Sequence, residues 1–280
     1  VQLMHKLALM AGAVCTLMLA ACAPPKPRHA AEPVDALRSS VMAGEPLNLS
    51  ISVLTSRNTE GTLVIYVHGT PGEAEGWIDY VVEPVTGSRS RALDRPGFGK
   101  SLPDTAVTSL AAQAAAVVAL FPQGSEKVVL VGHSLGGAVV ARVAAEHPER
   151  VSGLVLLASS LDPAQESINP LQPIGQMWPV QAMLPRMLRN ANDELMAFKQ
   201  ELLLLQPMLN RVKAPTVIVH GTRDDLVPFA NVAYMTTHLT GAQCVTTRVL
   251  EGVNHFLPWN SEPAVRAAIA WALHPVCTAP

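Results

Sequence analysis

Short, mostly apolar runs alternate with amphipathic stretches along most of the chain. The runs are typical of strands buried on both faces of a sheet. They lie at residues 62–67, 90–93, 128–131, 151–158, 216–220 and 245–250. Stretches that predict helices lie at about 108–120, 135–147 and 264–273. Residues 47–55 alternate apolar with polar, which indicates an antiparallel strand. This order predicts an α/β fold, in which helices cover both faces of a mostly parallel sheet.

The alternation stops between residues 159 and 214. Met and Leu recur there at helical spacing, and prolines interrupt the predicted helices. Open α/β sheets bind ligands beyond the carboxyl ends of their strands, so an insertion at this place predicts a helical lid over the site. A satellite packing cluster is the alternative. The lid is therefore assigned to residues 159–214, and the α/β core to residues 45–158 and 215–280.

The N-terminal residues have the composition of an export signal. His5 and Lys6 give a positive start, and the apolar run that follows is too short to span a bilayer comfortably. The run ends in Leu19-Ala20-Ala21-Cys22, which resembles the lipobox of bacterial lipoproteins. The resemblance implies that residues 1–21 are removed and that Cys22 is lipidated. An ordinary secretory signal with an incidental Cys22 is the alternative.

A polar, proline-rich stretch follows Cys22. It has no hydrophobic period, so residues 22–44 are predicted to form an extended tether. The lipoprotein resemblance implies an exported protein that is held on a membrane by its N-terminal lipid. Ala23, where an aspartate would retain a lipoprotein at the inner membrane, implies the outer membrane, facing the periplasm or the cell surface.

Composition excludes some classes of partner. The formal net charge is −2 and charged residues make up 15% of the chain, so a basic surface for nucleic acid is not expected. Exported proteins meet an oxidising compartment, which makes Cys244 and Cys277 a candidate disulfide. Two buried free thiols are the alternative. No cluster of Cys and His has the spacing of a zinc site.

A Gly-x-Ser-x-Gly motif centred on Ser134 lies between a predicted strand and a helix rich in small residues. This is the context of a nucleophile elbow, in which a serine sits on a sharp turn with its hydroxyl exposed above a sheet. Gly132 and Gly136 leave room for such a strained turn. The motif predicts Ser134 as a nucleophile, with an ordinary strand-to-helix turn as the alternative.

A serine nucleophile needs a general base, and the base needs a third group that fixes its tautomer. The sequence places Asp224 and His255 after two later strands, in the order serine, acid, histidine. With these motifs, residues 47–273 resemble the α/β-hydrolase superfamily. Its Gly-x-x-Asp-x-x-Val-Pro and closing Gly-x-x-His patterns assign the acid to Asp224 and the base to His255. Asp225 and Asp162 are the alternative acids.

The same resemblance assigns the oxyanion hole to the main-chain N–H groups of Leu135 and Thr70. The turn at residues 94–101 is also shared with the superfamily, and it is expected to be structural. Three further histidines are expected to make structural or local hydrogen bonds: His68, His133 and His147.

The resemblance implies a serine hydrolase, and we expect a carboxylesterase that cleaves small, largely apolar esters. Its partner would be a small-molecule ester, and no metal or organic cofactor is expected. Alternatives are a proline-iminopeptidase-like enzyme, a carbon–carbon bond hydrolase, or a catalytically silent binding lipoprotein. The iminopeptidase loop His-Gly-Gly-Pro-Gly has glycine where this chain has Thr70, which argues against that alternative.

Overall fold

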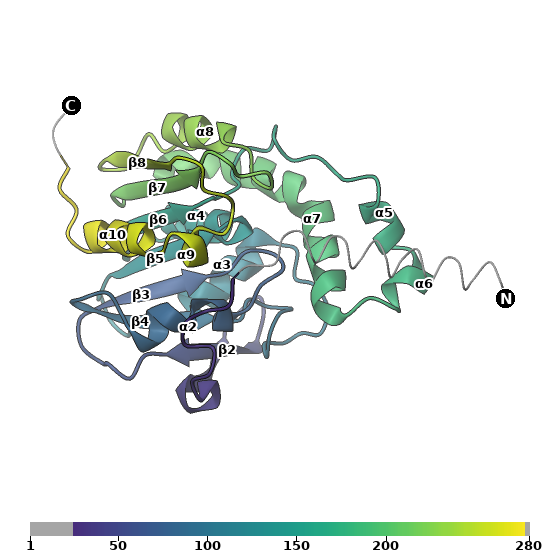
Figure 1. Ribbon diagram of the computed structural model, residues 1–280, viewed down its shortest axis with the longest axis horizontal. Coiled ribbons are helices and arrows are strands. Elements are labelled where there is room, and N and C mark those ends of the chain that lie inside the picture. Colours follow the sequence, from purple (N-terminus) through teal and green to yellow (C-terminus); the bar gives the residue numbers. More distant parts are fainter. Residues whose placement is uncertain (1–24, 278–280) are drawn as a thin grey trace.

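A computed structural model of the protein describes residues 25–277, in which eight strands form one sheet (Figure 1). The strands follow one another across the sheet in the order β1-β2-β4-β3-β5-β6-β7-β8. Their bounds are Arg38–Ala43 (β1), Leu49–Thr55 (β2), Thr62–Val67 (β3), Ser88–Leu93 (β4), Val128–His133 (β5), Val151–Leu157 (β6), Thr216–Gly221 (β7) and Val245–Leu250 (β8). The β1–β2 and β2–β4 pairs are antiparallel and the remaining pairs are parallel. The predicted fold class is confirmed.

Helices cover both faces of the sheet because strand side chains alternate between two cores. On β3, Leu63, Ile65 and Val67 point into one core, whereas Val64 and Tyr66 point into the other. The first face is covered by α3 (Leu110–Val118), α4 (Leu135–Glu146) and α8 (Ala230–His238). The second is covered by η2 (Ala74–Trp77), α2 (Ile78–Val82), α9 (Leu257–Asn260) and α10 (Glu262–Leu273). Burial on both faces explains why the central strands read as continuous apolar runs.

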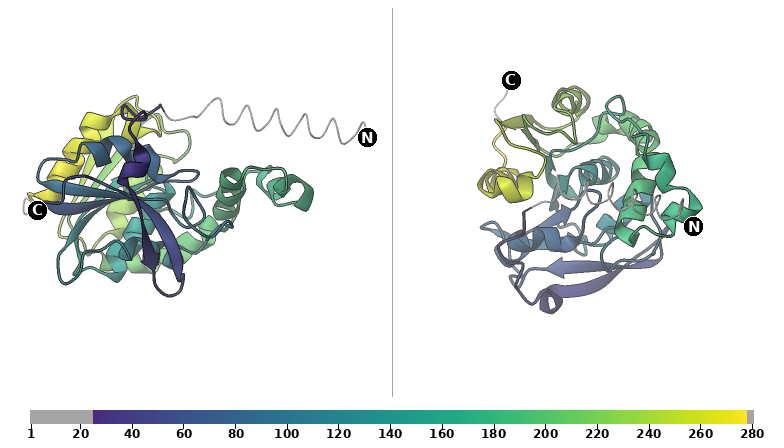
Figure 2. Two further views of the ribbon diagram at one scale, coloured as in Figure 1. Left: turned by 90° about the horizontal axis from the view of Figure 1, so that it is seen from below. Right: turned by 45° about the vertical axis from the view of Figure 1, so that its right-hand side comes forward.

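The insertion after β6 consists of an exposed arm and a long helix. The arm contains α5 (Gln172–Gly175) and α6 (Trp178–Gln181), which bury none of their residues, and it projects away from the sheet (Figure 2). Large apolar side chains are exposed along it: Ile168, Leu171, Ile174, Met177, Trp178 and Met183.

The long helix α7 (Arg186–Leu205) leads back from the arm to the sheet. It is followed by η3 (Gln206–Arg211). The last turns of α7 pack Phe198, Leu202 and Leu205 into the first core. Residues 159–214 therefore do not form a separate unit, because the second half of α7 belongs to the core of the α/β domain.

The predicted extended tether, residues 22–44, is wrong in its second half. Residues Val34–Leu37 form a short helix, η1, and β1 then pairs with β2 along its whole length. Ala43 is the one buried residue of β1, because this strand lies at the edge of the sheet. An edge strand of this kind lacks the alternation of apolar residues that reveals β2. The predicted signal, residues 1–21, and Cys22 lie outside the described residues.

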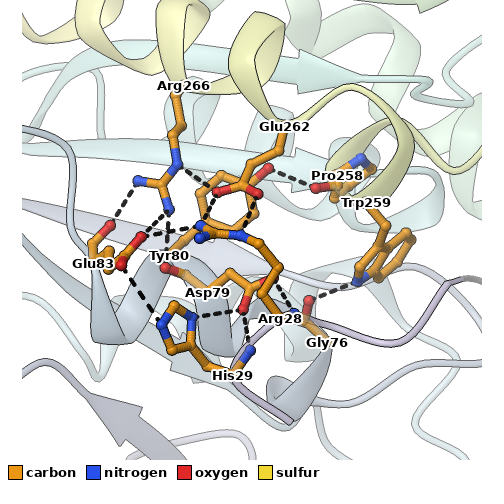
Figure 3. Close-up of polar contacts among 10 residues, drawn as sticks. All are labelled: Arg28, His29, Gly76, Asp79, Tyr80, Glu83, Pro258, Trp259, Glu262 and Arg266. Carbon is orange, nitrogen blue, oxygen red and sulfur yellow. Dashed lines mark hydrogen bonds and ion pairs between the residues drawn. The ribbon is translucent and has the colours of Figure 1, made fainter.

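Upstream of η1, the chain is fastened to the second face of the sheet (Figure 3). The Asp79 carboxylate accepts the backbone N–H groups of Arg28 at 2.9 Å and of His29 at 2.8 Å, and the His29 ring at 2.9 Å. The Arg28 guanidinium reaches Glu83 at 3.0 Å and Glu262 at 2.7 Å. These contacts, which we call the N-terminal clamp, join the start of the described chain to α2 and α10.

A disulfide fastens the other end of the described chain. It joins Cys244, just before β8, to Cys277, after α10, with their Cα atoms 5.7 Å apart. The helices within residues 25–277 include none that is both long enough and apolar enough to cross a membrane.

Candidate active site

Ser134 lies at the turn between β5 and α4, with φ 56° and ψ −127°. This backbone conformation is strained for a residue that carries a side chain. Glycine at position 136 permits the turn, because a Cβ there would lie 2.4 Å from the carbonyl oxygen of Val67. Gly69 packs against the serine itself, since a Cβ on it would lie 2.8 Å from the Ser134 Cβ. The half-buried serine thus lies where β3 and β5 end.

Asp224 and His255 form a hydrogen-bonded pair beyond the ends of β7 and β8. His255 Nδ1 lies 2.8 Å from Asp224 Oδ2. The other carboxylate oxygen accepts the backbone N–H groups of Leu226 at 2.9 Å and Val227 at 2.8 Å. Burial raises the pKa of Asp224, but the hydrogen bonds from His255, Val227 and Leu226 outweigh it and hold the pKa below its usual value. Asp224 is therefore an ionised acceptor that leaves Nε2 of His255 free to act as a base.

His133 brings the His255 loop against the elbow. The rings of His133 and His255 lie with their centroids 4.7 Å apart, and His133 Nε2 is 2.9 Å from the His255 carbonyl oxygen. Burial, together with a smaller contribution from the neighbouring His255, lowers the pKa of His133 to about 3. His133 is therefore a neutral donor. No hydrogen bond joins the Ser134 hydroxyl to the His255 imidazole in the described part of the chain; such bonds often tighten only when substrate binds.

The structure places Asp224, rather than its two rivals, against His255. Asp225 is exposed on the same loop, and Asp162 accepts the backbone N–H of Ala164. A histidine that the sequence analysis assigned no role lies beside this pair. His220 Nε2 is 3.0 Å from the Val227 carbonyl oxygen and 3.6 Å from Asp224 Oδ2. The sequence could have indicated this contact, because His220 lies four residues before Asp224 at the end of a predicted buried strand.

Two main-chain N–H groups are free beside Ser134. Leu135 is the first residue of α4, and Thr70 follows Gly69, which contacts the serine. Neither N–H has an acceptor among residues 25–277, and the buried Thr70 hydroxyl also lacks a partner there. Free donors next to a nucleophile suit an oxygen that gains negative charge during a reaction. Leu135 and Thr70 thus both lie beside Ser134, and their assignment to an oxyanion hole stays a prediction.

Asp94, in the turn after β4, joins that turn to its surroundings. Its fully buried carboxylate accepts from Ala74 N–H at 2.7 Å, Lys100 N–H at 3.0 Å and the Arg38 guanidinium at 2.7 Å. These contacts give Asp94 the structural role expected from the sequence. Among the described residues, no group of three or more His, Cys, Asp or Glu side chains is arranged to hold a metal ion.

Curated proteins that resemble the chain include two hydrolases. The pimeloyl-(acyl-carrier protein) methyl ester esterase of Edwardsiella ictaluri is 39% identical over 97 residues, which cover 35% of this chain and 36% of the esterase. The 2-hydroxy-6-oxononadienedioate/2-hydroxy-6-oxononatrienedioate hydrolase of a Pseudomonas species is 33% identical over 124 residues, 42% of either chain. The chain spans about a quarter to two fifths of the length of the curated relatives it matches.

The fold is shared with solved structures, which cover from 83% to 98% of this chain. A membrane phospholipase A, described as a novel bacterial virulence factor, superposes with a TM-score of 0.63 at 22% identity, covering 98% of this chain and 99% of that one. The family model for the alpha/beta hydrolase fold matches residues 62–201, which are half of the chain. The chain belongs to the α/β-hydrolase fold family.

Proposed function

We propose that the protein is a serine carboxylesterase whose catalytic triad is Ser134, His255 and Asp224. The observation that carries the proposal is the buried Asp224–His255 pair, 2.8 Å between Oδ2 and Nδ1, beside a serine held in a strained turn. Ordinary turns do not need a serine in that conformation, and a buried carboxylate on a histidine ring leaves the opposite nitrogen available as a base.

The arrangement supports acyl transfer in two steps. His255 Nε2 takes the proton of the Ser134 hydroxyl as Oγ attacks the acyl carbon, and the N–H groups of Leu135 and Thr70 donate to the oxygen that becomes negative. When the tetrahedral intermediate collapses, His255 returns the proton to the departing alcohol and leaves an acyl ester on Ser134. Water, deprotonated by the same histidine, then releases the carboxylic acid and restores the serine.

We propose small, largely apolar esters as the substrate class. The insertion beside the site is rich in Met and Leu, and one curated relative is named as a methyl ester esterase. A second candidate is carbon–carbon bond hydrolysis, because the other hydrolase relative is named for a 2-hydroxy-6-oxo dienedioate. The same nucleophile, base and oxyanion donors would serve either reaction.

We also propose that the enzyme is an exported lipoprotein anchored through a lipid on Cys22. The support is the sequence Leu19-Ala20-Ala21-Cys22 at the end of an apolar run. Metabolic labelling with an alkyne fatty acid would incorporate label into the parent chain and not into Cys22→Ser. Equal labelling of both chains would contradict the anchor without touching the catalytic proposal.

The catalytic proposal is tested with p-nitrophenyl esters from acetate to palmitate, using the parent chain and Ser134→Ala. We expect Ser134→Ala to lose on the order of 10⁴-fold or more of kcat, because the nucleophile is removed. A fluorophosphonate probe should label the parent and not the variant. A labelled parent that cleaves no ester would favour carbon–carbon bond hydrolysis. A folded parent that is neither active nor labelled would contradict a serine hydrolase and favour a silent binding protein.

A further inference from the structure

The peptide unit between Gly69 and Thr70 carries one of the two proposed oxyanion donors. Its N–H belongs to Thr70 and its carbonyl to Gly69, and the bond between them is trans, so the two groups point in opposite directions. Whatever holds the Gly69 carbonyl therefore also aims the Thr70 N–H. Because Gly69 packs directly on Ser134, a small rotation of this peptide would move the donor relative to the reacting oxygen.

Two side chains hold the Gly69 carbonyl oxygen. His68 Nδ1 lies 2.7 Å from it, and Arg95 Nη2 donates to it at 2.9 Å. His68 is neutral, because burial and the nearby Arg95 charge hold its pKa well below the usual value. Its Nε2 accepts the backbone N–H of Arg95 at 3.0 Å, so the proton lies on Nδ1 and His68 is a donor as well. The carbonyl thus receives two hydrogen bonds, one of them from a charged group.

Arg95 is itself held by the insertion. Its guanidinium forms a forked pair with Glu194 of α7, at 2.6 Å and 3.0 Å, and neither side chain is more than 2% exposed. Gln113 of α3 donates to the same carboxylate at 2.8 Å. A buried guanidinium that loses its carboxylate is strongly unfavourable, so the position of Arg95 depends on that of α7.

We propose that Arg95, held by Glu194, is a positioning residue that aims the Thr70 N–H into the oxyanion hole and so couples that hole to the cap helix α7. The inference rests on the proposed function of Ser134 and deepens it. The Arg95 charge draws the Gly69 carbonyl away from the serine and polarises the peptide, which strengthens the opposite N–H as a donor. Displacement of α7 would remove the partner of Arg95 and loosen that donor.

The test uses the double variant Arg95→Met/Glu194→Leu. Replacing both members of a buried ion pair by apolar residues of similar volume usually preserves folding, whereas removing one member does not. The control is Arg186→Gln, because Arg186 also ties α7 to the turn after β4, through the carbonyls of Gly99 and Ser101, without contacting Gly69. Thermal unfolding checks the fold of each variant, and the readouts are kcat, KM and inhibition by an alkylboronic acid.

We expect the double variant to lose about ten- to a hundredfold of kcat, below the full effect of losing an oxyanion donor, with KM within about threefold of the parent. Boronate inhibition should weaken in proportion, because the tetrahedral adduct uses the same N–H, and Arg186→Gln should change neither quantity. Arg95→Lys, which keeps a cation for Glu194, should recover part of kcat.

A folded double variant with the parent's kcat and boronate affinity would overturn the inference, as would an equal loss in Arg186→Gln. Should the double variant unfold, a parental kcat and boronate affinity in folded Glu194→Gln, in which Arg95 loses its charged partner, would overturn it instead. A parent chain that neither cleaves esters nor takes a fluorophosphonate label marks failure of the proposed function, which is a separate result.

Discussion

Ser134 has the backbone conformation that its proposed chemistry requires. A residue with a side chain at φ 56° carries strain on the order of 1–3 kcal/mol, which its surroundings must offset. Its N–H donates to Leu157 at 3.0 Å, and its carbonyl accepts Gly137 N–H at 2.9 Å. These bonds fix the turn on both sides, so the hydroxyl is held in place before any substrate arrives.

Replacing either carboxylate by an amide tests whether Asp224 or its neighbour Asp225 is the acid of the proposed triad. Asp224→Asn should lower kcat on the order of 10⁴-fold, because an amide no longer enforces the His255 tautomer with Nε2 free. Asp225→Asn, on the exposed neighbour, should leave kcat within about twofold. Ester hydrolysis by the two variants side by side decides the assignment, and a comparable loss in both would contradict it.

Buried neutral histidines should make the fold sensitive to acid. The pKa of His133 is about 3 in the folded chain, so between about pH 6.5 and pH 3 mainly the unfolded chain takes up this proton, and stability falls as the pH decreases through this range. This residue alone should lower the free energy of unfolding by about 2 kcal/mol between pH 8 and pH 5. The lowered pKa values of His68 and His220 act in the same direction.

Urea unfolding at both pH values checks this expectation. His133→Asn, whose amide can still donate to the His255 carbonyl, should lose less stability on acidification than the parent. Equal losses in the two chains would show that His133 does not contribute.

At the scale of elements, α7 has two different surfaces. Arg186, Asn190 and Glu194 recur every four residues, so they share one face, and Asn190 donates to the Gly97 carbonyl at 2.7 Å. This polar face is tied to the turn after β4, whereas the apolar residues near its end enter the core. The helix is therefore fixed along its length, although the arm before it buries none of the residues of α5 or α6.

Substitutions in the exposed arm and in the buried half of α7 should differ in how far they lower the free energy of unfolding. Trp178 is 80% exposed, and Trp178→Ser should change the free energy of unfolding by less than about 0.5 kcal/mol. Phe198 is 3% exposed, and Phe198→Ala should cost about 3–5 kcal/mol through lost burial and a cavity. Chemical denaturation measures both, and a large cost at Trp178 would show that the arm is packed.

The sequence predicted those elements whose pattern lies within a few consecutive residues. Central strands are recognised as continuous apolar runs, and the turn at Ser134 is recognised because its glycines and serine lie within five residues. β1 was missed because an edge strand with one buried residue has no such pattern. The pairing of Arg95 with Glu194 was missed for a different reason: the two residues lie 99 positions apart in the sequence. The bond from Arg95 to a main-chain carbonyl was missed because no residue type reveals it.

At the scale of the molecule, both ends of the described chain are fastened. The N-terminal clamp holds Arg28 and His29 to α2 and α10, and the disulfide holds the segment after α10 to the start of β8. These contacts hold the segment before η1 and the segment after α10 against the rest of the domain.

Removing the disulfide should weaken the fold without altering catalysis. The bond joins residues 33 positions apart, and a loop of that size stabilises a domain by about 2–4 kcal/mol through the unfolded state. Cys277→Ser should therefore lower the free energy of unfolding by that amount, with kcat at 25 °C unchanged. Denaturation of the parent with and without reductant provides the control, because reductant should reproduce the effect of the variant. A parent whose stability ignores reductant would contradict the prediction.

The N-terminal clamp also determines which elements of the fold would receive a force applied to the N-terminal segment. Residues 23–27 alone separate Cys22 from Arg28, a reach of about 20 Å when fully extended. A lipid on Cys22 would thus keep the domain close to the bilayer, while the domain could still change its orientation relative to the membrane. Tension on this segment would therefore reach Asp79, Glu83 and Glu262, on α2 and at the start of α10, before it reached the edge strand β1.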